Sequence, residues 1–294
     1  MIIDILLLFV GITGLIIGTY TDIRWREVPD FLSYILIILA IFLRLIYSIT
    51  TSDWYFLLYG IIGMIIGFGI GIIMYYTGQW GGGDSKFIIG LFGLFATTPI
   101  FLFGNLIFNF PFSFILVLLL NIFFVGAAYS LIYAIVMTFI NLKLFRKEFL
   151  SQHTKYKIIA NVCYIVFSIM IIISFFLSEI MKILIFVVAF FVPVTFYLFI
   201  YIKSVEKSCF VKKYSVEKLT EGDWVIDDIK IKGKKIYSQK DLGISKEQIR
   251  LLKKNKINFV MVKEGVPFLP AFLLAFALTY FVGNWLFMIF MMRI

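Results

Sequence analysis

Long apolar stretches recur along the whole chain and constrain its fold more than any other feature. A helix needs about 20 mostly apolar residues to cross the roughly 30 Å hydrocarbon core of a membrane. Only 15% of the 294 residues are charged and 62% are hydrophobic. The sequence therefore predicts an all-α polytopic membrane protein with about 8 (6 to 8) transmembrane helices. The predicted spans lie near 2–20, 31–49, 54–77, 86–108, 112–142, 158–177, 181–202 and 267–291.

The spans and the polar stretches between them divide the chain into four predicted segments. These are a membrane core at 1–142, a basic loop with additional transmembrane helices at 143–202, a small cytoplasmic α+β domain at 203–266, and a C-terminal transmembrane helix at 267–294. In the polar insert, "DWVIDDIKIKGKKIYS" alternates partly like a strand pair with a Gly-Lys turn, and "INFVMV" is typical of a further strand. Ser245 with Gln248 forms a capping box that predicts an amphipathic helix, and Pro267 and Pro270 return the chain to the membrane.

Lysines and arginines predict the orientation, because short cytoplasmic loops of membrane proteins carry an excess of them. Arg24 and Arg26 follow the first span, the loop 143–157 holds five basic residues and one acidic, and the stretch 203–266 holds 16 basic and 9 acidic residues. All three lie after odd-numbered spans. We therefore expect the N-terminus outside the cell membrane and the loops 21–30, 77–85, 143–157 and 203–266 in the cytoplasm. The first span is expected to be retained, since it lacks the basic lead-in and cleavage site of a signal peptide.

Several chemistries are disfavoured by composition. His153 is the only histidine, and Cys163 and Cys209 are too few and too far apart for a zinc ribbon. A Ser-His hydrolase would lack a base within the membrane. No metal and no cofactor is expected. The basic insert contains no recognisable nucleic-acid-binding motif, so no nucleic-acid partner is expected either.

Two aspartates stand out because each lies where a predicted span meets the cytoplasmic face. Asp22 ends the first span, and Asp84 follows the third within "TGQWGGGDSKF". Gly14 and Gly18 continue the row of Asp22 on one helix face, and Gly63, Gly67 and Gly71 form a second row. Small residues at this spacing let helix backbones approach closely in lipid. If the two rows pack against one another, Asp22 and Asp84 come together; otherwise each row packs on another helix and the aspartates are interfacial caps.

Paired carboxylates can perform hydrolysis without a metal. Two carboxylates within a few ångströms cannot both ionise easily, so one stays charged while the other keeps a proton. The charged one can activate a water and the protonated one can donate to the leaving group. Two other hypotheses remain open: an ion- or proton-coupled transporter using Asp22 and Asp84, and a non-enzymatic assembly scaffold. Few polar residues lie at mid-span, and Arg44 near the outer end of the second span is interpreted as an interfacial side chain.

The residues around both aspartates resemble those of a known family. "GGGD" at 81–84 resembles the G-x-G-D signature of membrane aspartic proteases, and Asp84-Ser85-Lys86 its D-x-K extension. "DIRWREVP" at 22–29 resembles the first motif of type IV prepilin peptidases and archaeal preflagellin peptidases. The resemblance covers residues 1–142 well, and the C-terminal part looks like that of archaeal members.

This resemblance implies a membrane aspartic endopeptidase with Asp22 and Asp84 as the catalytic pair. Its substrates would be type IV prepilin-like or preflagellin (archaellin) precursors, cut after a short basic leader at the cytoplasmic face. No N-methyltransferase activity is expected, because the paired CxxC motifs of bacterial members are missing. Gly81 and Gly83 would serve where the backbone turns tightly and approaches the substrate. Arg24, Arg26 and Lys86 match basic motif positions, although anchoring on the cytoplasmic side explains them equally well.

A basic leader approaching a basic membrane face should be repelled, which suggests an acidic patch that offsets the repulsion. Six carboxylates are candidates for leader recognition, although a solvated charged surface explains them too: Glu27, Asp30, Glu221, Asp223, Asp227 and Asp228.

Overall fold

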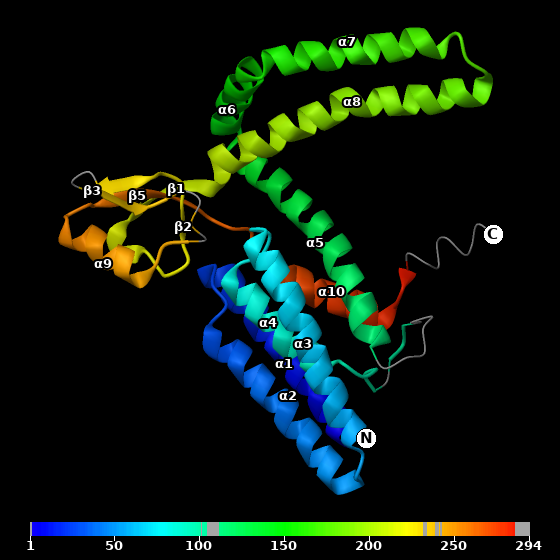
Figure 1. Ribbon diagram of the computed structural model, residues 1–294, viewed down its shortest axis with the longest axis vertical. Helices are drawn as coiled ribbons and strands as arrows, with labels where there is room; N and C mark the ends of the chain where they lie inside the picture. Colours follow the sequence, from blue (N-terminus) through cyan, green and yellow to red (C-terminus); the bar gives the residue numbers. More distant parts are fainter. Residues whose placement is uncertain are drawn as a thin grey trace. The chain divides into compact units, whose positions relative to one another are not determined.

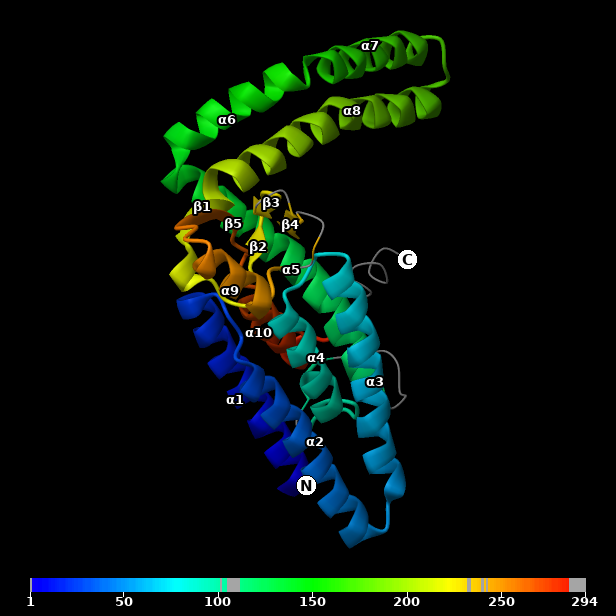
Figure 2. The ribbon, with the colours of Figure 1, turned by 60° about the vertical axis from the view of Figure 1, so that its left-hand side comes forward.

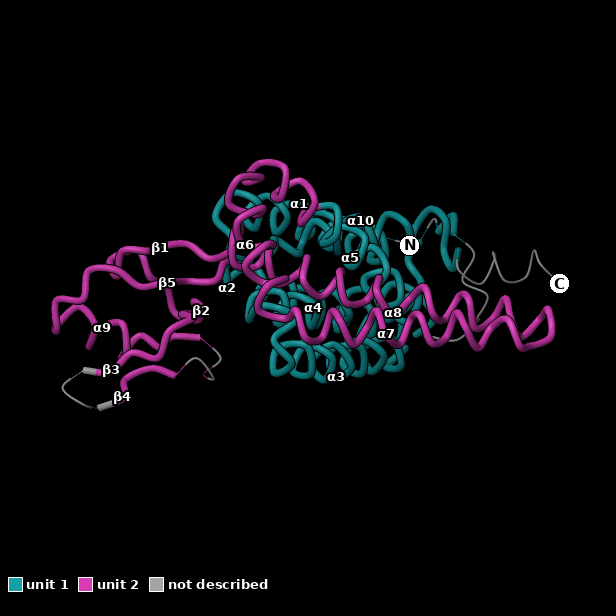
Figure 3. The backbone as a smooth tube through the Cα atoms, turned by 90° about the horizontal axis from the view of Figure 1, so that it is seen from above, with its two compact units in different colours: residues 1–132, 265–294 teal, residues 133–264 magenta. Residues whose placement is uncertain are grey.

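The structure is a computed structural model that describes residues 2–100, 102–104, 112–231, 234–238, 241 and 243–285. It divides into two compact units, Met1–Ile132 with Gly265–Ile294, and Tyr133–Glu264 (Figure 3). These are packing units, and the four predicted segments stay a prediction. The C-terminal part joins the N-terminal unit because α10 packs against α1, and 133–264 forms one unit by itself.

Long apolar helices dominate both units (Figure 1). The first unit contains α1 (Ile2–Trp25), α2 (Asp30–Thr51), α3 (Trp54–Tyr76) and most of α5 (Ser113–Ile140). The second contains α7 (Lys157–Ser174) and α8 (Glu179–Val205). Over the described ranges, these six helices are long and apolar enough to cross a membrane. The prediction of a polytopic helical membrane protein is confirmed, at the lower end of the expected number of spans.

Two predicted spans are shorter helices than expected. α4 (Gly82–Leu94) and α10 (Leu269–Phe281) have 13 residues each, about 20 Å at 1.5 Å per residue, which is too short to cross. The predicted fourth span at 86–108 is therefore wrong as one continuous helix. Its helix ends before Thr97-Thr98-Pro99, since a residue that precedes proline disfavours helical backbone. In the predicted last span at 267–291, α10 ends at Phe281 and the helix is interrupted at 282–284, with Gly283 at φ 78°; residues from 286 on lie outside the described residues.

The glycine row of α3 packs against α4 and not against α1 (Figure 2). Of the two alternatives for the glycine rows, packing against one another is therefore wrong, and packing of each row on another helix is the one that the structure shows. On this face of α3 the backbone touches carbonyl oxygens of α4. A Cβ added to Gly63 would lie 2.4 Å from the carbonyl oxygen of Phe92. The same distance is 2.9 Å from Gly67 to the oxygen of Ile88, and 2.5 Å from Gly71 to the oxygen of Ser85. α4 takes this place because its own Gly90 allows a close approach to α2 on its other side, where a Cβ would lie 2.7 Å from Leu36 Cβ.

Arg44 is fully buried, so its interpretation as an interfacial side chain is wrong. Its guanidinium donates to the carbonyl oxygens of Gly93 (2.8 Å) and Leu94 (3.0 Å), the last two residues of α4, and to that of Phe56 in α3 (2.8 Å). Gly60 leaves the space for it, because a Cβ there would lie 2.3 Å from Arg44 Cδ. Arg44 therefore provides the donors that the C-terminus of α4 lacks.

The second unit joins a helical hairpin to a small α+β module. After α6 (Leu142–Lys155), α7 and α8, a π-helical turn (Glu206–Phe210) leads into a three-stranded antiparallel sheet of order β1-β5-β2. Its strands are β1 (Val211–Ser215), β2 (Trp224–Val225) and β5 (Phe259–Lys263); β3 (Ile229–Ile231) and β4 (Lys234–Tyr237) form a separate antiparallel pair, and α9 spans Lys246–Lys254. The predicted α+β insert is confirmed, including the capping box of Ser245 and Gln248. Part of the predicted Gly-Lys turn, Gly233, lies outside the described residues.

Two glycines of α3 give a matched test of this packing. Gly71→Ala places a methyl group 2.5 Å from the Ser85 oxygen, so we expect a loss of stability on the order of 1–3 kcal/mol. Gly69→Ala, on the same helix, meets nothing within 4 Å and should be neutral or slightly stabilising, because alanine favours helix. Thermal unfolding in detergent measures both. Equal stability of the two variants would contradict the α3–α4 packing.

Candidate active site

Asp22 lies in the last turn of α1 and is only 5% exposed. Its Oδ2 accepts a hydrogen bond of 2.9 Å from the backbone N–H of Leu269, the first residue of α10. The first four N–H groups of a helix have no partner within the helix, and the helix dipole favours negative charge there. The carboxylate of Asp22 therefore satisfies a donor of another helix, 247 residues away in sequence.

Asp84 is half-buried in the first turn of α4. Its Oδ2 accepts a hydrogen bond of 3.1 Å from the backbone N–H of Gly81, the N-cap residue of the same helix. Asp84, like Asp22, accepts from an N–H at the positive end of a helix. The N–H that donates to Asp84 belongs to the residue that caps its own helix, and not to another helix.

The two motif glycines play a different part from the one expected. Gly81 has φ −68°, Gly83 is helical, and neither has a positive φ. Gly83 is required by packing, because a Cβ there would lie 2.8 Å from Val28 Cβ. The tight turn before the motif falls instead at Gly78, with φ 68°.

The fold brings the two aspartates together through α4. Gly18, one turn before Asp22, faces Phe87, which follows Asp84 by one turn; a Cβ on Gly18 would lie 3.2 Å from Phe87 Cε2. Burial, and then the negative charge of Asp22, raise the pKa of Asp84 to about 8. The contact of Gly18 with Phe87 thus brings together the turns that carry the two carboxyl groups, although the glycine rows of α1 and α3 do not pack against one another.

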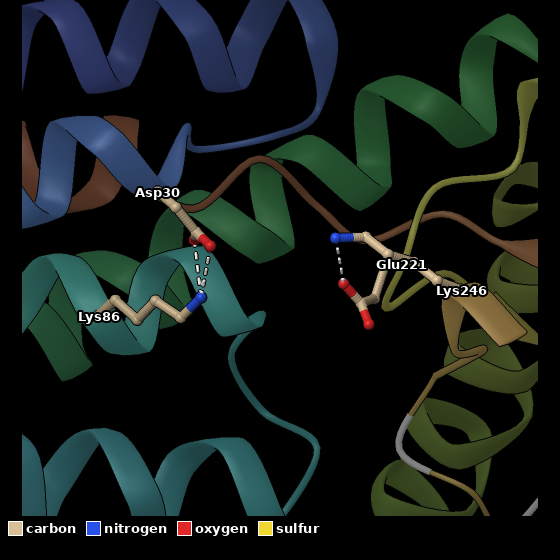
Figure 4. A network of polar contacts seen from close by, with 4 residues as sticks. All are labelled: Asp30, Lys86, Glu221 and Lys246. Atoms are coloured by element: carbon tan, nitrogen blue, oxygen red, sulfur yellow. Dashed lines mark hydrogen bonds and ion pairs between the residues drawn. The ribbon is translucent and has the colours of Figure 1, made fainter.

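The basic motif residues are engaged at different places. Lys86 Nζ lies 2.7 and 2.8 Å from the two carboxylate oxygens of Asp30, which links α4 to the start of α2 (Figure 4). Arg26, with φ 60°, donates through Nη1 to the carbonyl oxygen of Gly265 at 3.0 Å. Arg24 is exposed.

Several of the candidate leader-binding carboxylates have partners. Glu221 pairs with Lys246 at 3.2 Å (Figure 4), and Asp228 pairs with Lys235 at 2.9 Å. Asp223 accepts from the backbone N–H of Thr220 at 2.8 Å. Together with the pair of Asp30 and Lys86, these contacts reduce the negative charge offered to a basic peptide. Glu27 and Asp227 are exposed.

An aromatic cluster beside the site was missed from the sequence. Trp80, four residues before Asp84, is 2% exposed, and its ring lies 5.1 Å from Phe272, 5.9 Å from Phe268 and 6.3 Å from Phe123, between ring centroids. The signal in the sequence was a tryptophan within a short, glycine-rich polar connection. Its aromatic partners in and next to α5 and α10 are distant in sequence, so they could not be identified from it. Over the described ranges, no group of three or more His, Cys, Asp or Glu side chains could hold a metal ion.

Comparison with known proteins matches the part of the chain that holds both aspartates. The model of the type IV leader peptidase family matches residues 9–131. Similar proteins named preflagellin peptidase come from Methanococcus maripaludis (38% identity over 82 residues) and Methanocaldococcus jannaschii (33% over 82). A third, from Methanococcus voltae, is 28% identical over 133 residues.

The matches cover parts of each protein. They take in 28% of this chain and 35% of the first two relatives, and 45% of this chain and 57% of the third. The chain thus spans about a third to somewhat over half of the length of these relatives. The resemblance seen in the motifs around Asp22 and Asp84 is confirmed, since residues 9–131 match the model of the type IV leader peptidase family and the similar proteins are named preflagellin peptidase.

Proposed function

We propose that the protein is a membrane aspartic endopeptidase that removes the short basic leader of preflagellin-like or type IV prepilin-like precursors. The observation that carries this proposal is the packing of Gly18 on Phe87, which joins the turns that hold Asp22 and Asp84, inside the region matched by the leader peptidase family. The names of the similar proteins favour preflagellin-like substrates.

The surroundings of the two carboxyl groups suggest unequal roles. Burial and the charge of Asp22 both raise the pKa of Asp84, so Asp84 keeps a proton near neutral pH and acts as the acid. Asp22, stabilised as a carboxylate by the N–H of Leu269, takes a proton from water. The water oxygen bonds to the peptide carbonyl carbon, Asp84 donates its proton to the leaving nitrogen, and the C–N bond breaks.

The proposal includes an orientation in the cell membrane. The C-terminal end of α1 and the N-terminal end of α4 carry the aspartates, and the adjoining loop 21–30 holds Arg24 and Arg26. By the distribution of positive charges, this end faces the cytoplasm and the N-terminus faces outside. Cleavage then occurs at the cytoplasmic face, where a basic leader joins an apolar helix.

The first test replaces each aspartate separately. Asp22→Asn and Asp84→Asn each keep the size of the side chain and remove the acid-base chemistry, so each should lower leader cleavage by about 100-fold or more. Cleavage of a preflagellin-like precursor by the purified protein in detergent is measured. Asp53→Asn is the matched control, because Asp53 is exposed and caps α3, a task that asparagine also performs. Full cleavage by either of the first two variants would refute the catalytic pair, and would leave the transporter and scaffold hypotheses.

The second test uses pH. Because the pKa of Asp84 is about 8, the fraction of Asp84 that holds the donated proton falls as pH rises through that value. We expect the rate of cleavage to decline above about pH 8, and also at acidic pH where both carboxyls are protonated. The rate is measured from pH 4 to 10 in about half-unit steps, with stability followed in parallel. A rate that keeps rising beyond pH 9, roughly one unit above that pKa, would contradict the role of Asp84 as acid.

The third test concerns leader recognition by the exposed carboxylates. Glu27→Lys reverses one charge close in sequence to Asp22, and we expect it to weaken cleavage of a precursor with a basic leader by about threefold to tenfold. A precursor whose leader lysines are replaced by glutamine should be affected much less. Asp227→Lys tests the second unit in the same way, and Glu148→Lys is a control in α6. Equal effects on both precursors would count against an electrostatic attraction of the leader.

A further inference from the structure

We infer that the segment 265–272, which leads into and begins α10, is a third part of the site and holds both aspartates in place. The segment lies outside the region 9–131 matched by the leader peptidase family. In the first unit it contacts the end of α1 on one side and the connection between α3 and α4 on the other. The inference deepens the proposed function and rests on it.

On the side of α1, three hydrogen bonds fix the segment. The N–H of Leu269 donates to Asp22, the hydroxyl of Thr19 donates to the carbonyl oxygen of Leu269 at 3.2 Å, and Arg26 donates to that of Gly265. Leu269 is fully buried, and its Cδ1 lies 3.0 Å from the position of a Cβ on Gly18. The last two turns of α1 are thereby bound to the start of α10 by polar groups of both the backbone and the side chains.

On the side of Asp84, the contacts are aromatic. Phe268 and Phe272 pack against Trp80, and Phe272 also lies 6.5 Å from Phe87, between ring centroids. Trp80 and Phe87 stand on either side of Asp84 in sequence. The connection that carries Asp84 is therefore held by two buried aromatic contacts to the same segment that bonds to Asp22.

One short segment thus sets the separation of the two carboxyl groups. Thr19, Trp80 and Phe272 touch no reacting atom in this arrangement; they are positioning groups that act through Asp22 and Asp84. The N–H of Leu269 bonds to the Asp22 carboxylate itself. Misplacing a catalytic group by about 1 Å can cost on the order of 100-fold in rate. Loosening the segment should therefore lower kcat and leave KM almost unchanged, because substrate binding does not depend on the spacing of the carboxyls.

The test removes the aromatic contact. Trp80→Ala should lower kcat by about 10- to 100-fold with KM changed by less than about twofold. Trp80→Phe, which keeps a ring against Phe272, should restore most of kcat. The control is Phe114→Ala, because Phe114 is fully buried and packs on Phe276, in the second half of α10. It should lose stability without losing kcat at a temperature where it stays folded. Equal kcat for Trp80→Ala and Phe114→Ala would overturn the inference.

The polar contact is tested by a second pair of variants. Thr19→Val keeps the shape of the side chain and removes the hydrogen bond to Leu269, so kcat should fall by about threefold to tenfold. Thr19→Ser keeps the hydroxyl and should retain kcat. Equal kcat in the two variants would show that this bond does not position Asp22.

A distance measurement decides the inference even if no precursor is cleaved. Spin labels are placed by Ile23→Cys and Gln79→Cys, at exposed positions beside Asp22 and Trp80, after Cys163 and Cys209 are replaced by serine. The distance distribution should be narrow in the otherwise unchanged protein and in Phe114→Ala, and broad in Trp80→Ala. An unchanged distribution in Trp80→Ala would overturn the positioning role. Absence of cleavage by the unsubstituted protein would instead refute the proposed function alone.

Discussion

The hydrogen bonds from Arg44 to the C-terminus of α4 are the contact on which the arrangement of the first unit depends. α4 ends among apolar helices, where no water is at hand for its last carbonyl groups, and an unsatisfied group there costs several kcal/mol (roughly 2–7). A planar guanidinium provides several donors in fixed directions, which a lysine cannot reproduce. Its charge also suits the negative end of the helix dipole. A helix too short to cross can therefore lie inside the bundle.

This short helix decides where Asp84 lies. Its C-terminal end is bound to Arg44 of α2, its sides fit the glycines of α3, and Lys86 pairs with Asp30 at the start of α2. With both ends and two faces fixed, the first turn of α4 stays at the end of the unit where α1 also ends. A flexible glycine-rich connection would not hold a carboxyl group in this way, and the rigidity comes from helix packing and not from the motif itself.

How far the sequence predicted this arrangement depends on the range of the interactions. The six long helices and the capping box of α9 follow from local pattern, and they were predicted. The end of α4 depends on a donor 50 residues earlier, Arg44, and a single arginine in a span looks the same whether it reaches the interface or is buried. The glycine row of α3 predicted close packing, but a row of small residues does not identify its partner. Both aspartates were found from motif and topology, whereas the bond from Leu269 to Asp22 joins residues 247 apart and has no local signal.

The two carboxyl groups have similar surroundings, but their hydrogen-bond donors come from different parts of the chain. Each accepts a hydrogen bond from an N–H at the start of a helix, which stabilises a negative charge, and each is at least half-buried, which disfavours it. Asp84 receives its hydrogen bond from Gly81 of its own connection, so this donor is kept whenever α4 is folded. Asp22 receives its bond from α10, so its donor is present only when α10 is docked on α1. An event that shifts the start of α10 would therefore change the stability of the Asp22 carboxylate and leave the cap of Asp84 intact.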